Sequence, residues 1–220
     1  MGARERAETV ARIEDCGVVA VIRLPDPSKV RAVAEALAAG GVKALEVTMT
    51  VPRAIELIGE IAPTLPDGFV IGAGTVLDAD TAHAAILAGA RFIVGPVFRP
   101  AVIGVCHRYG VAAIPGCFSP TEILTAWEAG ADVVKVFPAT ALGPTFFKDV
   151  RGPLPQLKLM PTGGVSLDNA ADWIRAGAVA IGVGTALVDA KLVAAGDFAA
   201  ISGRAARFVE AVRAARGKAS

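Results

Sequence analysis

The chain has 220 residues, of which 54% are hydrophobic and 20% are charged, and its formal net charge is +1. This composition excludes a disordered chain, and the near-neutral balance provides no basic surface for nucleic acid. Gly, Pro or a charged residue interrupts every apolar run before the ~18 residues that a membrane-spanning helix requires. We therefore expect a folded protein that binds neither nucleic acid nor membrane.

No segment predicts secretion or a metal centre. Residues 1–15 alternate charge and alanine and lack the apolar centre of a signal peptide. The three cysteines are scattered and form no CxxC pair, which predicts reduced thiols in the cytoplasm. His83 and His107 have no partner at a metal-ligand spacing, so we expect neither a metal nor another cofactor.

Short runs rich in β-branched residues alternate with helical stretches along the chain. The eight runs, which predict eight strands, are residues 18–23, 42–48, 69–74, 91–94, 112–115, 132–137, 158–161 and 179–183. Between the first two, Val30, Val33, Ala34 and Leu37 recur at helical spacing. Such alternation predicts a parallel sheet whose helices cover it.

Local signals mark the ends of the predicted helices. Asp26-Pro27 places a capping residue before proline, and Ser119-Pro-Thr-Glu122 matches a capping box. An Ala-Gly pair followed by Gly or Ala precedes the second, fourth, sixth and eighth predicted strands. The glycines of these pairs are Gly40, Gly89, Gly130 and Gly177. A left-handed glycine that closes the preceding helix explains each pair, and the recurrence indicates a repeating architecture.

Eight strand–helix units without a linker predict one (β/α)8 TIM barrel domain over residues 1–220. An extra N-terminal helix, about residues 3–15, is expected across the bottom of the barrel, and a final helix over 198–213 outside it. An open doubly wound sheet is the alternative, but it predicts a glycine-rich GxGxxG turn after the first strand, where this chain has Arg23-Leu-Pro-Asp26. Chemistry in such barrels lies at the carboxyl ends of the strands. The polar residues there are Arg23, Glu46, Thr48, Thr75, Lys135, Thr162 and Thr185.

Lys135 lies in the sixth predicted strand. Alternation places it on the same face as Val133 and Phe137, and helices outside the barrel make either face apolar. An amine kept from water is more easily held neutral and can attack a ketone to form an imine. The imine withdraws electrons from the adjacent carbon, as cleavage of a 2-keto-4-hydroxy acid requires. The alternative is a structural lysine that extends its ammonium out of the barrel end.

Glu46 lies in the second predicted strand, on the same face as Ala44 and Thr48. The opposite face carries Leu45 and Val47, which suit packing against helices. Strands two and six lie on opposite sides of an eight-stranded barrel, and both are even-numbered. Because each layer of the barrel interior takes side chains from alternate strands, inward residues of these two strands can lie in the same layer. We therefore expect this carboxylate to face the lysine. A structural buried ion pair is the alternative, although such pairs stabilise poorly and more often mark function at a catalytic end.

Glycine-rich turns follow the last two predicted strands. Pro161-Thr-Gly-Gly-Val-Ser166 is predicted to open a helix after the seventh strand, and Gly182-Val-Gly-Thr185 follows the eighth. Backbone amides exposed in turns at these two positions are typical of phosphate sites in barrels. Tight turns without a ligand remain the alternative for each motif taken alone.

Six motifs together resemble a known family, the 2-keto-3-deoxy-6-phosphogluconate (KDPG) and 4-hydroxy-2-oxoglutarate (KHG) aldolases. They occur in the family's order and spacing, and the similarity runs from about Val18 to Val188. The motifs are Leu45-Glu-Val-Thr48, Ile71-Gly-Ala-Gly-Thr75, Phe92-Ile-Val-Gly-Pro96, Pro115-Gly-Cys-Phe-Ser-Pro-Thr-Glu122, Val134-Lys-Val-Phe-Pro138 and Pro161-Thr-Gly-Gly-Val-Ser166.

The resemblance implies a homotrimeric, metal-free, class I aldolase that cleaves the phosphorylated keto acid to pyruvate and glyceraldehyde 3-phosphate. It implies that Lys135 forms the Schiff base and that Glu46 is the general acid/base. The residues that it places around the substrate are Thr75 beside pyruvate, Pro96 in the pocket, Thr162, Gly163 and Gly164 in the pocket turn, and Gly184 and Thr185 on the phosphate turn.

One position departs from the family pattern. Better-known members carry arginine four residues after the glutamate, where it holds the pyruvate carboxylate, and this chain has Thr50 there. Arg23, at the end of the neighbouring first strand, shares the inward face of Val19 and Val21. We assign Arg23 to the substrate carboxylate, with a surface arginine as the alternative.

Other functions fit parts of the pattern. A phosphate-handling barrel isomerase or epimerase shares the glycine turns but needs no lysine on strand six. A sugar-phosphate-binding barrel without catalysis needs no lysine–glutamate pair. Within the family, an aldolase for galactonate-type keto-deoxy sugar acids is the alternative. Cys117 and Arg99 follow strands five and four and are weak candidates for the pocket; for Cys117 a small buried thiol is the preferred interpretation.

Overall fold

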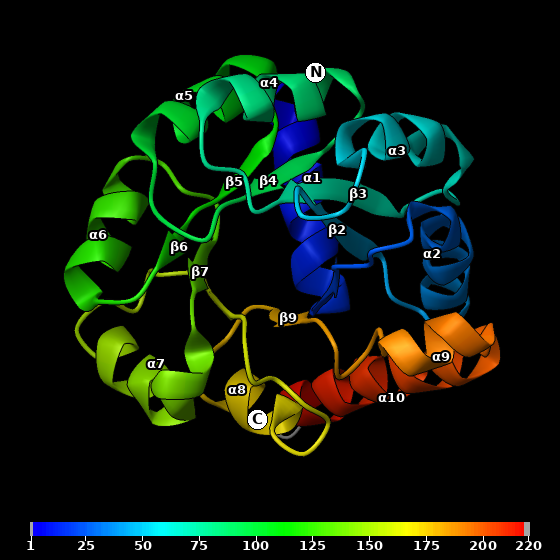
Figure 1. Cartoon of the computed structure of the whole chain (residues 1–220). Helices are drawn as coiled ribbons and strands as arrows, with labels where there is room; N and C mark the ends of the chain where they lie inside the picture. Colours follow the sequence, from blue (N-terminus) through cyan, green and yellow to red (C-terminus); the bar gives the residue numbers. More distant parts are fainter. Residues whose placement is uncertain (1, 218–220) are drawn as a thin grey trace.

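Parallel strands surrounded by helices form the body of the molecule (Figure 1). The computed structural model describes residues 2–217. Its β segments are β1 Val18–Ile22, β2 Ala44–Thr48, β3 Val70–Gly74, β4 Phe92–Val94, β5 Ala112–Ile114, β6 Gly116–Cys117, β7 Val134–Val136, β8 Leu159–Pro161 and β9 Ile181–Val183. Its helices are α1 Ala3–Cys16, α2 Val30–Ala39, α3 Ala54–Ile61, α4 Ala79–Leu87, α5 Pro100–Tyr109, α6 Pro120–Glu128, α7 Gly143–Arg151, α8 Ala170–Arg175, α9 Ala190–Ala195 and α10 Phe198–Gly217, with 3₁₀ turns at Pro27–Lys29, Ala62–Thr64 and Ala139–Ala141.

The strands close into a barrel through two hydrogen-bonded sheets. One has the order β5-β4-β3-β2-β1-β9 and the other β6-β7-β8. Pro115 lies between β5 and β6 and has no N–H to donate, so the fifth predicted strand is divided into these two segments. The carbonyl of Pro115 still accepts a hydrogen bond from the Lys135 N–H, at 2.9 Å. A parallel bridge between Thr162 and Gly182 joins the ends of β8 and β9. The predicted (β/α)8 barrel is confirmed.

Alternating side chains of the strands build two separate hydrophobic clusters, as the period of two requires. The outer cluster lies between the barrel and its helices. The inner cluster consists of Val10, Ile13, Val19, Ala44, Val70, Phe92, Val94, Ala112, Ile114, Val133, Met160 and Ala180. Ala44 and Val133 belong to this inner cluster and precede Glu46 and Lys135 by two residues. The glutamate and the lysine therefore lie one layer of side chains closer to the carboxyl end of the barrel than the inner cluster.

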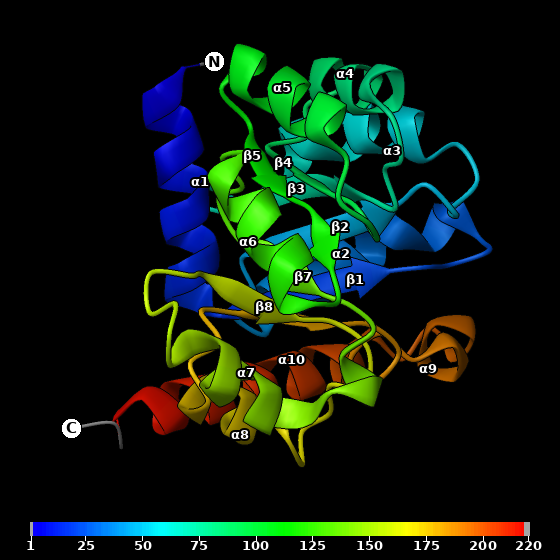
Figure 2. The same cartoon turned by 90° about the vertical axis from the view of Figure 1, so that its left-hand side faces the viewer.

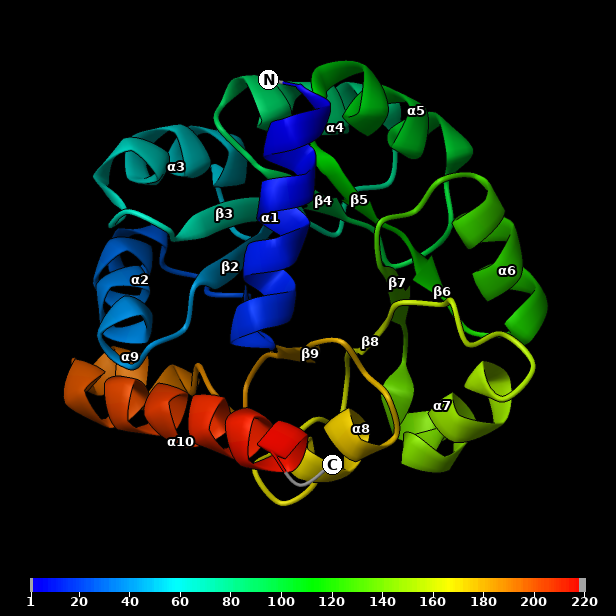
Figure 3. The same ribbon diagram turned by 180° about the vertical axis from the view of Figure 1, so that it is seen from behind.

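Helix α1 crosses the amino-terminal end of the barrel (Figures 2 and 3). Its buried residues Val10 and Ile13 belong to the inner cluster, so the helix closes the barrel from below. The observed span, Ala3–Cys16, confirms the extra helix expected at about residues 3–15. An apolar face of α1 thereby covers the amino-terminal end of the barrel.

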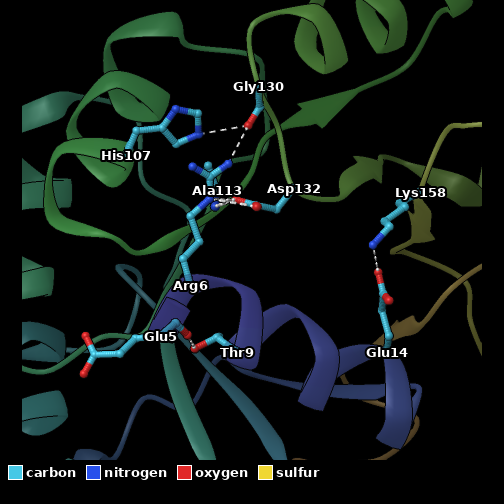
Figure 4. A network of polar contacts seen from close by, with 9 residues as sticks. All are labelled: Glu5, Arg6, Thr9, Glu14, His107, Ala113, Gly130, Asp132 and Lys158. Atoms are coloured by element: carbon cyan, nitrogen blue, oxygen red, sulfur yellow. Dashed lines mark hydrogen bonds and ion pairs between the residues drawn. The ribbon is translucent and has the colours of Figure 1, made fainter. Parts of the chain in front are cut away.

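Ion pairs attach α1 to the strands (Figure 4). Arg6 Nε donates to both oxygens of Asp132 at 2.8 and 2.9 Å, and Asp132 Oδ2 also accepts from the Ala113 N–H at 2.8 Å. Lys158 Nζ lies 2.7 Å from Glu14 Oε1. The Arg6–Asp132 pair is three-quarters or more buried on both sides, where a charge-assisted hydrogen bond is stronger than in water.

The helix ends follow the predicted glycine pattern with one correction. Gly89, Gly130 and Gly177 have φ of 112°, 92° and 99°, as a left-handed residue after a helix should. Gly40 instead has a φ of −83°, and Gly41 takes the left-handed conformation at 87°, because α2 runs one residue longer. A side chain at Gly40 would collide with Ser202 and Ala205 of α10, so close helix packing accounts for that glycine.

Helix α10 packs outside the barrel against α2 and α8, and it extends beyond the predicted range of 198–213 to Gly217. The capping box before α6 is present: the Ser119 hydroxyl accepts from the Glu122 N–H, and the Glu122 carboxylate accepts from the Ser119 N–H at 2.8 Å. Among residues 2–217, no helix is both long and apolar enough to cross a bilayer.

Candidate active site

Lys135 and Glu46 meet inside the barrel. Lys135 Nζ lies 3.9 Å from Glu46 Oε1, and their side chains are 2% and 0% exposed. β7 carries the lysine and β2 the glutamate, from opposite sides of the barrel, as strand parity predicts. The separation exceeds hydrogen-bond length, so the two groups are paired by charge without a direct hydrogen bond.

The carboxylate of Glu46 has no other polar partner. Neither of its oxygens accepts a hydrogen bond within residues 2–217, although a buried polar group without a partner is costly. Such an unsatisfied group in a native fold needs an explanation, and a catalytic role is one.

A cavity of about 380 Å³ opens at the carboxyl end of the barrel. Phe137 links it to the lysine, because its ring lines the cavity and its centroid lies 5.1 Å from Lys135 Nζ. Six of the residues predicted to bind substrate also line it: Arg23, Thr162, Gly163, Gly164, Gly184 and Thr185. Loops after β1, β8 and β9 therefore share one cavity. Lys135 and Glu46 are buried and are not among its lining residues, so Phe137 is what connects the cavity with the lysine.

The turn after β8 presents backbone groups to this cavity. Gly163 and Gly164 have φ of 95° and 72°, a conformation that ends the strand and cannot continue into a helix. Helix α8 consequently begins only at Ala170, and the prediction that this motif opens a helix directly is wrong. The Ser166 N–H donates to Asn169 Oδ1 at 2.9 Å instead. An anion in this cavity would meet turn amides rather than a helix terminus.

Thr162 also faces the cavity. Its side chain is nearly buried, and Oγ1 has no hydrogen-bond partner among the described residues. A side chain on Gly182, its bridge partner on β9, would overlap this hydroxyl. The hydroxyl is thus a free donor and acceptor at the base of the cavity.

Arg23 stands exposed at the rim of the cavity, and within residues 2–217 its guanidinium makes no ion pair or hydrogen bond. Thr50 is engaged elsewhere: its hydroxyl lies 2.7 Å from that of Thr48, which donates to the Ile22 carbonyl at 2.9 Å. Because the Thr48 hydroxyl donates its only proton to the Ile22 carbonyl, the Thr50 hydroxyl must donate to the Thr48 hydroxyl oxygen. Among the described residues Arg23 therefore has no carboxylate partner, and its guanidinium is available to an anion in the cavity.

Thr75 and Pro96 do not line the 380 Å³ cavity. Thr75 follows β3 with a φ of 59°, an unusual conformation for a residue with a branched side chain. The Pro96 carbonyl group lies against Gly116, which pairs with Lys135 in the sheet. Thr75 follows β3, which neighbours the strand of Glu46, whereas Pro96 follows β4, one strand further from β2.

Cys117 points away from the barrel interior and packs in the outer cluster. Burial raises the pKa of its thiol to about 12, so the thiolate that nucleophilic chemistry needs is absent at neutral pH. The preferred interpretation of Cys117 as a buried thiol agrees with this position. Arg99, the other weak candidate, precedes α5 and lines a separate small cavity beside β4.

Sequence reasoning assigned no role to Phe137, although it joins the lysine to the cavity. The signal was present, because Phe137 shares the inward face with Lys135 two residues earlier. Among the described residues there is no cluster of three or more His, Cys, Asp or Glu side chains suited to a metal ion.

The fold and the site together define a barrel enzyme class in which a buried lysine faces a carboxylate beside a cavity at the carboxyl ends of the strands. Residues 10–203 match the family model described as KDPG and KHG aldolase. The chain belongs to this family, and it is accordingly an aldolase, a carbon–carbon lyase. Family membership disfavours the isomerase, epimerase and binding-barrel alternatives.

Three known proteins illustrate the similarity. The 2-dehydro-3-deoxy-phosphogluconate aldolase of Treponema pallidum is 38% identical over 196 residues, covering 89% of this chain and 91% of that protein. The 2-dehydro-3-deoxy-6-phosphogalactonate aldolase of Escherichia coli K12 is 35% identical, covering 77% and 83%. The crystal structure of KDPG aldolase from Legionella pneumophila, with pyruvate captured as a covalent carbinolamine, matches with a TM-score of 0.83 and 30% identity, covering 90% and 96%.

Proposed function

We propose that this protein is a class I aldolase that reversibly cleaves 2-keto-3-deoxy-6-phosphogluconate to pyruvate and glyceraldehyde 3-phosphate through a Schiff base on Lys135. The observation that carries the proposal is the buried contact of Lys135 with Glu46, 3.9 Å apart. A related aldolase holds pyruvate as a covalent carbinolamine, which supports the same covalent chemistry here. KHG, cleaved to pyruvate and glyoxylate, and the galactonate analogue are the alternative substrates.

In the proposed reaction, Lys135 Nζ attacks the C2 carbonyl, and loss of water gives the imine. Glu46, through a bound water, removes the proton of the C4 hydroxyl. The C3–C4 bond breaks, its electrons move toward the imine to form an enamine, and the aldehyde leaves. Protonation at C3 and hydrolysis then release pyruvate and restore the amine.

The cavity residues are proposed to hold the two ends of the substrate. Amides of Gly163 and Gly164 are suited to the phosphate because left-handed glycine turns expose N–H groups. The Gly184 amide and the Thr185 hydroxyl line the same cavity and are proposed to complete the phosphate site. The unpartnered Thr162 hydroxyl is suited to the substrate between phosphate and imine. Thr75 and Pro96 are proposed to border the pyruvate part, on the other side of the lysine.

Arg23 is proposed to hold the substrate carboxylate in place of the arginine that Thr50 replaces. Arg23→Ala is expected to raise KM for the keto acid roughly 10- to 100-fold with a smaller change in kcat, because a charged hydrogen-bonding partner of the bound substrate is lost. Steady-state kinetics measure KM and kcat separately. Thr50→Arg in the Arg23→Ala background is expected to recover part of the lost KM. An unchanged KM in Arg23→Ala would contradict the assignment.

The substrate is tested by assaying KDPG, its galactonate analogue and KHG under identical conditions. We expect the highest kcat/KM for KDPG, since the turns beside the cavity are suited to a phosphate. A preference for the galactonate analogue would support the alternative within the same family, and a preference for unphosphorylated KHG would count against the phosphate site.

We further propose that the protein is a homotrimer of 22.4-kDa chains. Exposed apolar side chains at three loops on the catalytic face, Leu77, Val97 and Phe118, support an interface there. Light scattering after gel filtration measures the assembly mass, and a monomeric mass would contradict the proposal.

The remaining organisation is also proposed. We propose that residues 1–220 form one domain; this is supported within residues 2–217, where α1 and α10 both contact the barrel strand β1, and the first residue and the last three lie outside the described part. The described cysteines are all unpaired and buried, which supports a cytoplasmic location, since thiols persist in reducing compartments.

A further inference from the structure

Gly74, the last residue of β3, lies against the side chain of Glu46. A methyl group built at position 74 would overlap Oε1, Cδ and Cγ of Glu46, and these are its three nearest atoms. The φ of Gly74 is not in the left-handed region, so residues with a side chain can adopt its backbone conformation. The space occupied by Glu46 is therefore what excludes a side chain at position 74.

Few other contacts orient the Glu46 carboxylate. Within residues 2–217 neither oxygen accepts a hydrogen bond, and Lys135 Nζ at 3.9 Å is beyond hydrogen-bond length. Catalytic groups are usually held by surrounding hydrogen bonds and packing. Because hydrogen bonds are missing here, the walls around the side chain must set its direction, and the bare backbone of Gly74 is one of those walls.

We infer that Gly74 is a positioning residue: without a side chain it lets the Glu46 carboxylate lie where it can move protons to and from a substrate bound to Lys135. The inference rests on the roles proposed above for Lys135 and Glu46. Gly74 makes no contact with substrate in this arrangement and acts only through Glu46. Since misplacing a catalytic group by about 1 Å can cost roughly 10²-fold in rate, the effect is expected on proton transfer and not on imine formation.

Two measurements on the same protein separate these steps. Borohydride reduction in the presence of pyruvate reports the imine on Lys135, and exchange of the pyruvate methyl protons with D₂O reports proton transfer. Gly74→Ala is expected to trap pyruvate at close to the wild-type level with little change in KM. Its kcat and exchange rate are expected to fall about 10²-fold. Exchange at the wild-type rate would overturn the inference.

Gly72→Ala is the matched control. Gly72 lies two residues earlier on the same strand and face, but a methyl group there would meet the ring of Phe92 instead of Glu46. We expect Gly72→Ala to lower the melting temperature while the ratio of exchange to trapping stays at the wild-type value. An equal fall of that ratio in both variants would overturn the inference, because general crowding would then explain it.

A background without the carboxylate keeps the test decisive even if Gly74→Ala does not fold. In Glu46→Ala, the added methyl group has room, so Gly74→Ala should fold there and should lower the melting temperature much less than it does beside Glu46. An equal fall in both backgrounds would overturn the inference. If Glu46→Gln alone retains exchange, the proposed role of Glu46 fails; if Glu46→Gln loses exchange and Gly74→Ala does not, only the role of Gly74 fails.

Discussion

Replacing Lys135 with alanine is expected to abolish aldol cleavage and to prevent borohydride from fixing pyruvate to the protein. In the proposed reaction the Lys135 amine forms the covalent bond with the substrate, and among residues 2–217 it is Lys135 that pairs with Glu46. Wild-type protein should gain one reduced pyruvate adduct on the peptide that contains Lys135. Mass spectrometry of the digested protein and a coupled pyruvate assay measure both results.

Lys158→Ala is a suitable control for this loss. Lys158 lies near the start of β8, and its side chain is 40% exposed and paired with Glu14 on α1. Its removal breaks an ion pair at the opposite end of the barrel, so activity and trapping should remain near wild type. Cleavage at the wild-type rate by Lys135→Ala would rule out a Schiff base on Lys135. An adduct on another lysine of the wild-type protein would assign the Schiff base to that lysine instead.

Replacing Glu46 with glutamine is expected to lower kcat by roughly 10²- to 10⁴-fold, the usual contribution of general acid–base catalysis. The amide occupies the same space but cannot accept the C4 hydroxyl proton as a base. Lys135 remains, so pyruvate should still be trapped by borohydride. Steady-state cleavage, measured beside trapping, gives the two values.

The stability of Glu46→Gln gives an independent check. Glu46 is fully buried, and its oxygens have no hydrogen-bond partner among residues 2–217, so the carboxylate contributes little to the free energy of unfolding beyond its pairing with Lys135. Circular dichroism should therefore report a folded variant. A folded Glu46→Gln protein with wild-type kcat would contradict the proposed role.

The geometry of the buried pair supports the proposed catalytic roles of Lys135 and Glu46. An ion pair removed from water gains little net stability, because the desolvation of both charges offsets their attraction. A separation of 3.9 Å without a hydrogen bond weakens the structural alternative further. Natural folds keep such unfavourable arrangements at functional sites, and here the cavity lined by Phe137 lies next to it.

Much of this protein follows from patterns along the chain. Period-two alternation in β2 was sufficient to direct Glu46 inward, because successive side chains of a strand must point to opposite faces. In β7 alternation left both faces apolar, and the parity of the two opposed strands led to the expectation that Lys135 faces Glu46. Local hydrogen bonding was equally predictable, as in the Ser119–Glu122 capping box. The eight alternating units, without a GxGxxG turn after the first strand, favoured a closed barrel over an open doubly wound sheet.

Other features depend on contacts between distant segments, which no local pattern encodes. The left-handed turn lies at Gly41 because α2 is one residue longer than predicted, and Gly40 is required instead by its packing against α10, more than 150 residues later in the sequence. Arg23 lines the same cavity as the turns at Thr162 and Gly184 because β1, β8 and β9 lie next to one another in the barrel. This neighbourhood is visible only in the tertiary structure. Alternation and capping are set by neighbouring residues, so the chain alone determined the barrel and its inward lysine and glutamate. The tertiary structure decided which loops share a cavity and where glycine is required, because both depend on the steric fit of segments that are remote in sequence.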